Sequence, residues 1–209
     1  MRPGLYAIVD VDALRRGARD PVDFARRVLD AGPLAALQLR AKPLGAGAML
    51  ELASLLAPLC RAANTPFFVN DRADVAALAG ADGAHLGTTD LAVADARRAF
   101  PSLRYGSSSH TDAEALAAQG DAPDYLAFGP VFGTRSKADA APTVGLDALR
   151  ALCARTALPV VAIGGITLDN AASVREAGAR AGAVIAALVL DDGAVTARAR
   201  ALHLALGGG

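Results

Sequence analysis

Short apolar runs alternate with amphipathic stretches along the chain. The amphipathic stretches are rich in Ala, Leu, Arg and Asp, and carry apolar residues at helical spacing, as at Phe24, Val28 and Leu29. We predict strands at the apolar runs 5–9, 36–39, 67–69, 83–86, 104–106, 125–128, 160–163 and 183–186. Strands that alternate with helices form parallel sheets, and eight such units in 209 residues predict one (β/α)8 TIM barrel over residues 1–209. A doubly wound open sheet is the rival, disfavoured because no G-x-G-x-x-G follows the first strand.

Local signals mark where helices begin and end. We expect helix starts at Asp20-Pro21, at Thr111 with Glu114 three residues on, and at 167–169. We expect helix ends at 31–32, 79–80, 119–120 and 177–178, each closing on Gly. The long segment from 129 to 145 is expected to be a lid or a disordered surface loop, and the Gly-only tail 207–209 is expected to fray.

Composition narrows the class of protein. The chain is 53% hydrophobic with a formal net charge of zero, so nothing in its charge calls for nucleic acid or an anionic membrane as partner. We find no secretory signal at the N-terminus and no apolar run long enough to span a membrane, and we expect a cytoplasmic protein. With two Cys, we expect neither a disulfide nor a structural zinc site. Whether the chain forms a homo-oligomer stays open.

Candidate chemistry begins after the second predicted strand. In this fold reactive groups lie at the carboxyl ends of strands. Gln38 and Arg40 are two positions apart, so both can point into the barrel while Leu39 packs outward. Arg40 with Lys42 forms a candidate diphosphate site. The alternative is an Arg40 paired with an internal carboxylate and a merely solvated Lys42.

Two carboxylates follow the third and fourth predicted strands. Asn70 and Asp71 come directly after one, and Asp90 lies in the loop after the next. Mg²⁺ is usually held by one or two carboxylates together with substrate phosphates and waters, so the pair is a candidate magnesium site. Each Asp could instead serve as a helix N-cap.

Hydroxyl and basic side chains follow the fifth and sixth strands. Ser108 can face a ligand, whereas no adjacent acid makes a Ser-His-Asp triad. Thr134, Ser136 and Lys137 would bring two hydroxyls and an ammonium onto a lid, unless this is an ordinary solvated loop. His85 and His110 could equally be structural, and His203 has no evident partner in the sequence.

Small residues follow the last two strands. Gly165 belongs to a Gly-Gly pair, and Ala186 and Ala187 come at the end of the eighth run. In barrels this is where phosphate meets backbone N–H groups and a short helix N-terminus. The sequence thus suggests a second phosphate site.

Taken in order, six motifs resemble the thiamine-phosphate synthase family over nearly the whole chain. They are Q-L-R-A-K (38–42), V-N-D-R (69–72), H-L-G-x-x-D (85–90), G-S-S-S-H-T (106–111), F-G-P-V-F-x-T-x-S-K (128–137) and A-I-G-G-I-T-x-D-N (162–170). The resemblance implies a transferase that joins hydroxymethylpyrimidine diphosphate to a thiazole phosphate, plain or carboxylated, and releases diphosphate.

The resemblance also implies a role for each matching residue. Gln38 and Ser108 would contact the pyrimidine, and Asp71 and Asp90 would coordinate the Mg²⁺ cofactor. The implied diphosphate ligands are Arg40, Lys42, Asn70 and Lys137, and the implied thiazole-phosphate contacts are Thr134, Ser136, Gly165 and the 186–187 segment. Arg40, Ser108 and Lys137 would be the catalytic group.

Two departures from the family pattern bear on activity. Thr88 stands where the family commonly has Gln, and Ala186-Ala187 stands where it commonly has Ile-Ser. The related thiazole tautomerase is one alternative, but it carries a proton-transferring His where this chain has Pro130, and lacks the Asn-Asp pair. A barrel that binds thiamine precursors without turnover is another.

Overall fold

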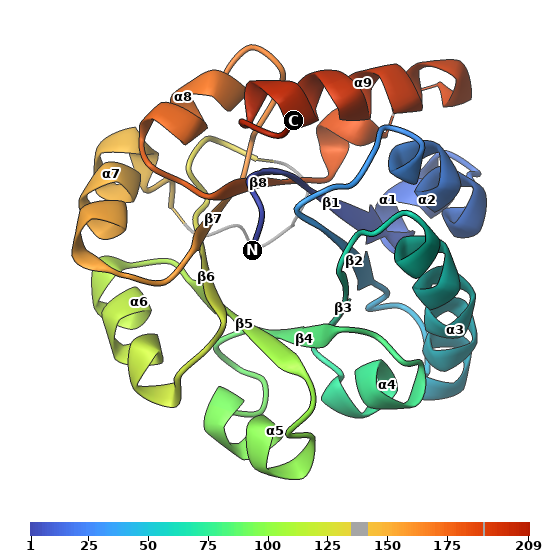
Figure 1. The fold of residues 1–209 in the computed structure, drawn as a ribbon, viewed down its shortest axis with the longest axis horizontal. Coiled ribbons are helices and arrows are strands. Elements are labelled where there is room, and N and C mark those ends of the chain that lie inside the picture. The colour runs from blue at the N-terminus through green and yellow to red at the C-terminus, as the bar shows by residue number, and fades with distance from the viewer. Residues whose placement is uncertain (135–141, 190) are drawn as a thin grey trace.

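Eight parallel strands form a closed barrel (Figure 1). The computed structural model describes residues 1–134, 142–189 and 191–209. Each strand pairs with the next one along the chain, and β8 pairs with β1. The strands are β1 Gly4–Asp10, β2 Ala36–Arg40, β3 Phe67–Asn70, β4 Gly83–Leu86, β5 Arg104–Ser109, β6 Tyr125–Phe128, β7 Val160–Ile163 and β8 Ala181–Val184. The predicted (β/α)8 TIM barrel is confirmed.

Helices surround the barrel, and α1 is an extra short helix at the end of β1 (Figure 1). Their bounds are α1 Val11–Arg16, α2 Pro21–Leu29, α3 Ala46–Ala62, α4 Ala73–Leu78, α5 Val93–Ala99, α6 Asp112–Ala118, α7 Gly145–Arg155, α8 Ala171–Glu176 and α9 Asp192–Ala205, with single 3₁₀ turns η1 Gln119–Asp121 and η2 Ala186–Leu188. No helix in the described ranges is long and apolar enough to cross a membrane.

Side chains at the helix starts explain two of the predicted boundaries and correct a third. Asp20 accepts hydrogen bonds from two backbone N–H groups of α2, and Thr111 accepts one from Glu114 N at 3.2 Å. The helix expected at 167–169 begins at Ala171 instead. Asn170 Oδ1 accepts from Thr167 N at 2.8 Å, so these residues form a turn ahead of α8.

The last strand lies two residues earlier than the predicted run 183–186. Gly182 pairs with Leu5 of β1 and Ala162 of β7, which sets the register of β8. The apolar run continues past the strand because Ile185 and Leu188 are still buried in the core. Hydrophobicity therefore misplaced the strand end, and residues 186–188 form η2.

Alternate positions along the strands separate an inner from an outer core. Leu39 packs outward in the large cluster between barrel and helices, as predicted. The interior is filled by aromatic and small side chains, with the rings of Phe68 and Tyr125 edge to face at 5.4 Å. This apolar floor supports the polar residues nearer the carboxyl ends of the strands.

The C-terminal tail contacts the barrel bottom. Gly207 and Gly208, which we expected to fray, donate hydrogen bonds to Leu204 O and His203 O. A Cβ on Gly208 would lie 2.1 Å from His203 Nε2, so only Gly fits here. His203 is buried and its Nδ1 accepts from Leu5 N at 3.2 Å, which identifies it as a structural residue.

Candidate active site

The side chain of Arg40 lies inside the barrel mouth with a carboxylate partner. Its Nη1 donates to Asp10 Oδ2 at 2.6 Å, and the two side chains are 13% and 3% exposed. Asp10 ends β1 and also accepts from Ala13 N at 2.9 Å, capping α1. The internal carboxylate considered as an alternative therefore exists. A guanidinium has five N–H donors, so the pair with Asp10 is compatible with an anion on the same side chain.

Asp10, the partner of Arg40 at the barrel mouth, was not singled out from the sequence. The signal available was its position directly after the first predicted strand and ahead of a helix. Its buried carboxylate compensates the charge of Arg40, which would otherwise be costly to place in the barrel.

Two acidic side chains meet beside this pair. Asp71 and Asp90 come from the loops after β3 and β4, and their carboxyl groups lie within hydrogen-bonding reach of each other. Burial, and then the neighbouring Asp90, raise the pKa of Asp71, while Lys42, whose Nζ is 3.3 Å from Asp71 Oδ2, lowers it. Three residues predicted for the site are thus brought together.

Neither carboxylate caps a helix. The N-cap of α4 is Arg72 and that of α5 is Ala92, and no side chain caps either helix. Asp90 Oδ2 accepts from Gly87 N at 2.7 Å within its own loop. Asp71 has a left-handed backbone, φ +66°, a conformation that Asp tolerates better than most residues and that is common at functional sites. The capping alternative is ruled out for both.

The donor set suits a magnesium ion. Two mutually repelling carboxylates, with a half-exposed Lys42 as counter-charge, offer oxygen ligands whose charge a cation would neutralise. Other ligands to such an ion would come from substrate and water.

Gln38 and Ser108 lie on opposite strands of the mouth and join a chain of buried polar groups. Gln38 is 4% exposed and its Nε2 donates to Tyr6 Oη at 3.1 Å. Ser108 Oγ lies 2.8 Å from His85 Nε2. Asn70 ends β3 in register with His85 and is half-buried. His85 is thus a hydrogen-bonded interior residue, buried among the strands.

The glycines after β7 allow another loop to approach. Gly164 and Gly165 have φ of +100° and +64°, and a Cβ on either would collide with Pro130 or with Gly133 O. The described ends of the 129–145 segment are held here, since Phe132 N donates to Gly164 O and Val144 N to Pro130 O. Thr134 lies at the edge of this loop, whereas Ser136 and Lys137 fall outside the described residues.

Ala186 and Ala187 differ in their surroundings. Both belong to η2, but Ala186 is exposed whereas Ala187 is half-buried and packs against the outer core. Of the two, Ala186 is the more accessible position.

No activated nucleophile is found among the described residues. Burial raises the pKa of the Cys60 thiol to about 12 and that of Cys153 to about 11. His110 Nδ1 lies 2.7 Å from Gly129 O, and His110 N donates to Glu114 Oε2, so this histidine is tied to the backbone of its loop.

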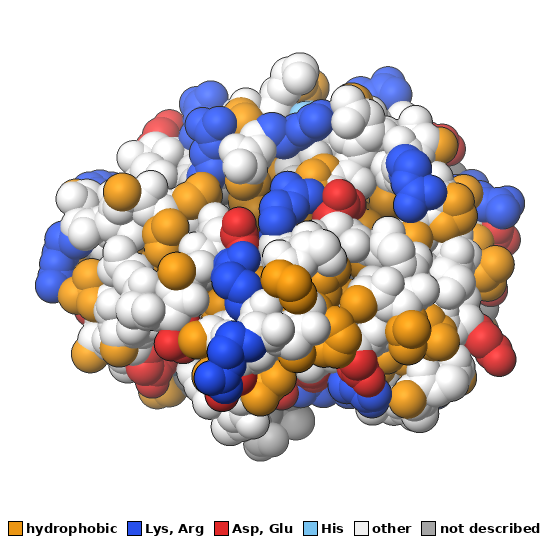
Figure 2. Space-filling view, turned by 60° about the horizontal axis from the view of Figure 1, so that its bottom comes forward, with side chains coloured by type: hydrophobic (Ala, Val, Ile, Leu, Met, Phe, Trp, Pro, Cys, Tyr) orange, Lys and Arg blue, Asp and Glu red, His pale blue; other side chains and the backbone are white. Residues whose placement is uncertain are grey.

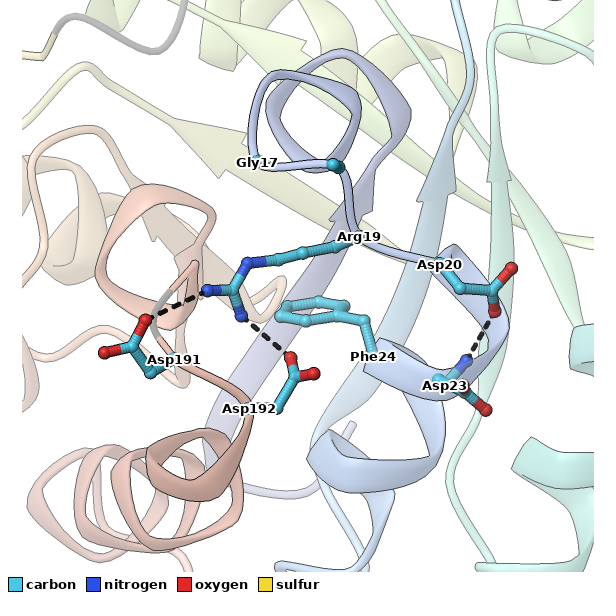
Figure 3. A pocket seen from close by; sticks show the side chains of 8 residues that line it. Gly17, Arg19, Asp20, Asp23, Phe24, Asp191 and Asp192 are labelled. Carbon is cyan, nitrogen blue, oxygen red and sulfur yellow. Dashed lines mark hydrogen bonds and ion pairs between the residues drawn. The ribbon is translucent and has the colours of Figure 1, made fainter.

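A separate hollow of about 260 Å³ lies between the starts of α2 and α9 (Figure 3). Arg19 spans it, 3.6 Å from Asp191 and 2.9 Å from Asp192. Asp20 and Asp23 line its other side. Since its carboxylates outnumber its one cation, this hollow repels phosphate. On the face shown in Figure 2, basic, acidic and apolar side chains alternate, in keeping with the zero net charge.

The fold and mouth together define a (β/α)8 barrel with cationic and acidic side chains gathered at the ends of β2 to β4. The family model described as thiamine monophosphate synthase matches residues 5–188. The chain belongs to this family.

Curated relatives and solved structures agree. The thiamine-phosphate synthase of Methanocella arvoryzae is 45% identical over 97% of this chain and 94% of its own length, and that of Chloroflexus aurantiacus is 44% identical over 95% and 90%. The structure of a thiamine phosphate pyrophosphorylase from Pyrococcus furiosus superposes with a TM-score of 0.86 at 35% identity, covering 97% of this chain and 95% of that one.

Proposed function

We propose that the protein is a thiamine-phosphate synthase. It joins hydroxymethylpyrimidine diphosphate to hydroxyethylthiazole phosphate, or its carboxylated form, and releases diphosphate. The observation that carries this proposal is the contact of Lys42 with Asp71 and of Asp71 with Asp90. These residues follow the neighbouring strands β2 to β4, and Arg40 lies at the end of β2. Family membership and the names of the relatives support the same activity.

The chemistry asks for charge stabilisation and positioning. The bond between the pyrimidine methylene and the diphosphate oxygen breaks, the diphosphate leaves with the electron pair, and the thiazole nitrogen supplies the pair for the new C–N bond. The resonance of the aminopyrimidine stabilises the cation between these events. Such a substitution needs no protein nucleophile, in accord with the raised thiol pKa values of both cysteines.

Residues of this chain divide the work. Arg40, Lys42 and Asn70 hold the diphosphate, while Gln38 and Ser108 hold the pyrimidine ring. Asp71 and Asp90 would hold Mg²⁺, which when bound neutralises charge on the departing diphosphate. Thr134, Ser136 and Gly165 are proposed to contact the thiazole phosphate, and Lys137 to close over the diphosphate.

The alternatives lack their key groups here. A tautomerase would need a proton-transfer group at the position of Pro130, which is a buried proline packed against Gly164. A barrel that only binds precursors has no need of two adjacent carboxyl groups, in which burial and then the neighbouring Asp90 raise the pKa of Asp71.

Turnover with purified protein tests the proposal. With both phosphorylated precursors and Mg²⁺ we expect thiamine phosphate and diphosphate in equal amounts, and EDTA should abolish the reaction. Thiazole isomerisation without joining would support the tautomerase, and binding without any product would support the non-catalytic barrel. Either result overturns the synthase.

A further inference from the structure

A chain of hydrogen bonds crosses the barrel interior from β2 to β5. Gln38 Nε2 lies 3.1 Å from Tyr6 Oη, and Tyr6 Oη lies 2.7 Å from Tyr125 Oη. Tyr125 Oη is 3.0 Å from His85 Nδ1, whose ring completes the chain at Ser108 Oγ, 2.8 Å from Nε2. We call these five side chains the relay. Its two ends are the residues assigned to the pyrimidine, so its middle members can influence how that ring is held.

The interior is shaped to hold the relay together. The rings of His85 and Tyr125 stack with centroids 5.7 Å apart and planes 18° from parallel. A Cβ on Gly106 would lie 2.3 Å from Tyr125 Oη and 2.6 Å from His85 Nδ1. A glycine at this position of β5 is therefore a condition for the central hydrogen bond.

The chemistry of the donors gives the relay a direction. An amide –NH₂ group can only donate, so Tyr6 Oη accepts from Gln38. Burial raises the pKa of Tyr6 and of Tyr125 far above the usual value, so each phenol keeps its single proton. The described partners of Tyr6 Oη are Gln38 Nε2 and Tyr125 Oη, and only the second can accept a proton, so Tyr6 donates to Tyr125. By the same argument Tyr125, which accepts from Tyr6, donates to His85 Nδ1. The imidazole consequently carries its hydrogen on Nε2 and donates it to Ser108.

We propose that the relay fixes Ser108 as a hydrogen-bond donor toward the ligand, with Tyr6, Tyr125 and His85 as positioning residues. Because Ser108 Oγ already accepts from His85, its own proton points to the site. The partner it selects is an acceptor, such as the lone pair of a ring nitrogen beside the amino group of an aminopyrimidine. The 4-oxo analogue carries hydrogen on that ring nitrogen, so its N–H donor would face the O–H donor of Ser108 without an acceptor between them. This inference rests on the proposed function for the identity of the ligand, though not for the direction of the relay.

The histidine tautomer tests the direction without any substrate. In ¹⁵N NMR spectra of the free protein, which has three histidines, we expect His85 as the Nε2–H form. The Gln38→Glu variant, at a pH of about 10, above the pKa of about 8–9 that a buried Glu can reach, should accept from Tyr6, reverse every bond and move the hydrogen to Nδ1. With Tyr125→Phe the tautomer of His85 should no longer depend on position 38, so Tyr125→Phe alone and Tyr125→Phe with Gln38→Glu should show the same form, because the reversal no longer reaches His85.

A matched control removes a buried phenol outside the relay. Tyr105 is fully buried, and its hydroxyl donates to Ala96 O and Phe100 O. Tyr105→Phe added to Gln38→Glu should leave the reversal intact. An Nδ1–H tautomer in the unmodified protein, or a tautomer indifferent to Gln38→Glu, would overturn the relay even if the enzyme makes thiamine phosphate.

Substrate selectivity tests the consequence for the ligand. The measured quantity is the ratio of kcat/KM for the aminopyrimidine diphosphate to that for its 4-oxo analogue. His85→Gln places an amide N–H near the position of Nε2 and should keep most of the ratio. His85→Asn reaches only the position of Nδ1 and should lower the ratio about tenfold, the weight of one hydrogen bond. Equal ratios in the two variants would contradict the role given to His85, and so would a ratio in His85→Asn that is unchanged from that of the unmodified protein.

Discussion

The two halves of the barrel mouth are built in different ways. At the ends of β2 to β4 the site consists of charged side chains, and each is held by another, as Arg40 is by Asp10 and Asp71 is by Lys42. At the ends of β7 and β8 it consists of glycine, alanine and backbone, and Gly164 and Gly165 are used to let a neighbouring loop approach. In the charged half, removing one charge should cause a large loss of activity or of stability, because its partner is left unpaired. In the half built from glycine, alanine and backbone, a substitution should act by steric clash, because an added side chain collides with the neighbouring loop.

The sharpest test of the charged half compares Arg40→Gln with Lys42→Gln. Removing Arg40 leaves Asp10 buried and unpaired, so the free energy of unfolding should fall by about 3–5 kcal/mol, with activity lost as well. Lys42 is 55% exposed, so its removal should cost at most about 1 kcal/mol while still lowering kcat/KM. Chemical denaturation and steady-state kinetics measure both. Equal losses of stability in the two variants would mean that the buried Arg40–Asp10 ion pair contributes no more to the stability of this half than the exposed Lys42.

The carboxylate pair should respond next most strongly. Asp71→Asn and Asp90→Asn should each reduce kcat/KM by about 100-fold, a loss typical of one transition-state charge contact, with a shifted Mg²⁺ dependence. Asp74→Asn is the matched control, since Asp74 lies on α4 and pairs with Arg72, the residue ahead of that helix. Unchanged Mg²⁺ dependence in both variants would show that the metal binds elsewhere.

The raised pKa of Asp71 gives a pH prediction with a definite sign. Its pKa is higher in the folded than in the unfolded chain, so the metal-free protein should lose stability relative to the Asp71→Asn variant as the pH rises through the folded-state pKa. Asp90→Asn removes one of the causes, and the loss should become smaller. Mg²⁺ should raise the melting temperature of the unmodified protein, because it binds the folded state only. If the difference in melting temperature between the unmodified protein and Asp71→Asn does not change with pH over this interval, the raised pKa of Asp71 is contradicted.

In the backbone half, Gly165→Ala should act through shape. A Cβ there would lie 2.4 Å from Gly133 O at a φ of +64°, so we expect a loss of about 1–3 kcal/mol. Gly120→Ala, where a Cβ meets nothing within 4 Å, should change stability by less than about 0.5 kcal/mol. Thermal melts of the two variants measure this difference in stability. Similar melting temperatures would mean that the loop does not depend on the glycine.

The smallest expected effect is a gain. Ala186→Ser should lower the KM for the thiazole phosphate by at most about tenfold, the contribution of one neutral hydrogen bond. Ala187→Ser should bring no gain, because Ala187 packs against the outer core. A larger gain at position 187 would show that the phosphate lies on the other side of η2.

The barrel was predictable because its signals are local. Apolar runs separated by helix-forming segments place seven of the strands within a few residues, and Asp20 and Thr111 cap the helices that they were expected to begin. The eighth strand was misplaced because burial continues beyond its end, through Ile185 to Leu188. Period alone does not distinguish a buried strand from a buried turn.

The site was predictable where one residue type at a strand end suffices. Arg40, Asp71 and Asp90 could be identified from the sequence because they are charged residues that follow apolar runs. Partners distant in sequence were not visible, such as Asp10 beside Arg40 on the neighbouring strand or the two tyrosines joining Gln38 to His85. These depend on which strands face one another across the barrel, and that is a property of the closed fold.

A structure with hydroxymethylpyrimidine diphosphate and Mg²⁺ tests the central claim most directly. We predict the diphosphate against Arg40, Lys42 and Asn70, with the metal bound by Asp71 and Asp90. A diphosphate held at the ends of β7 and β8, or a metal that contacts neither aspartate, would contradict the assignment of the charged half.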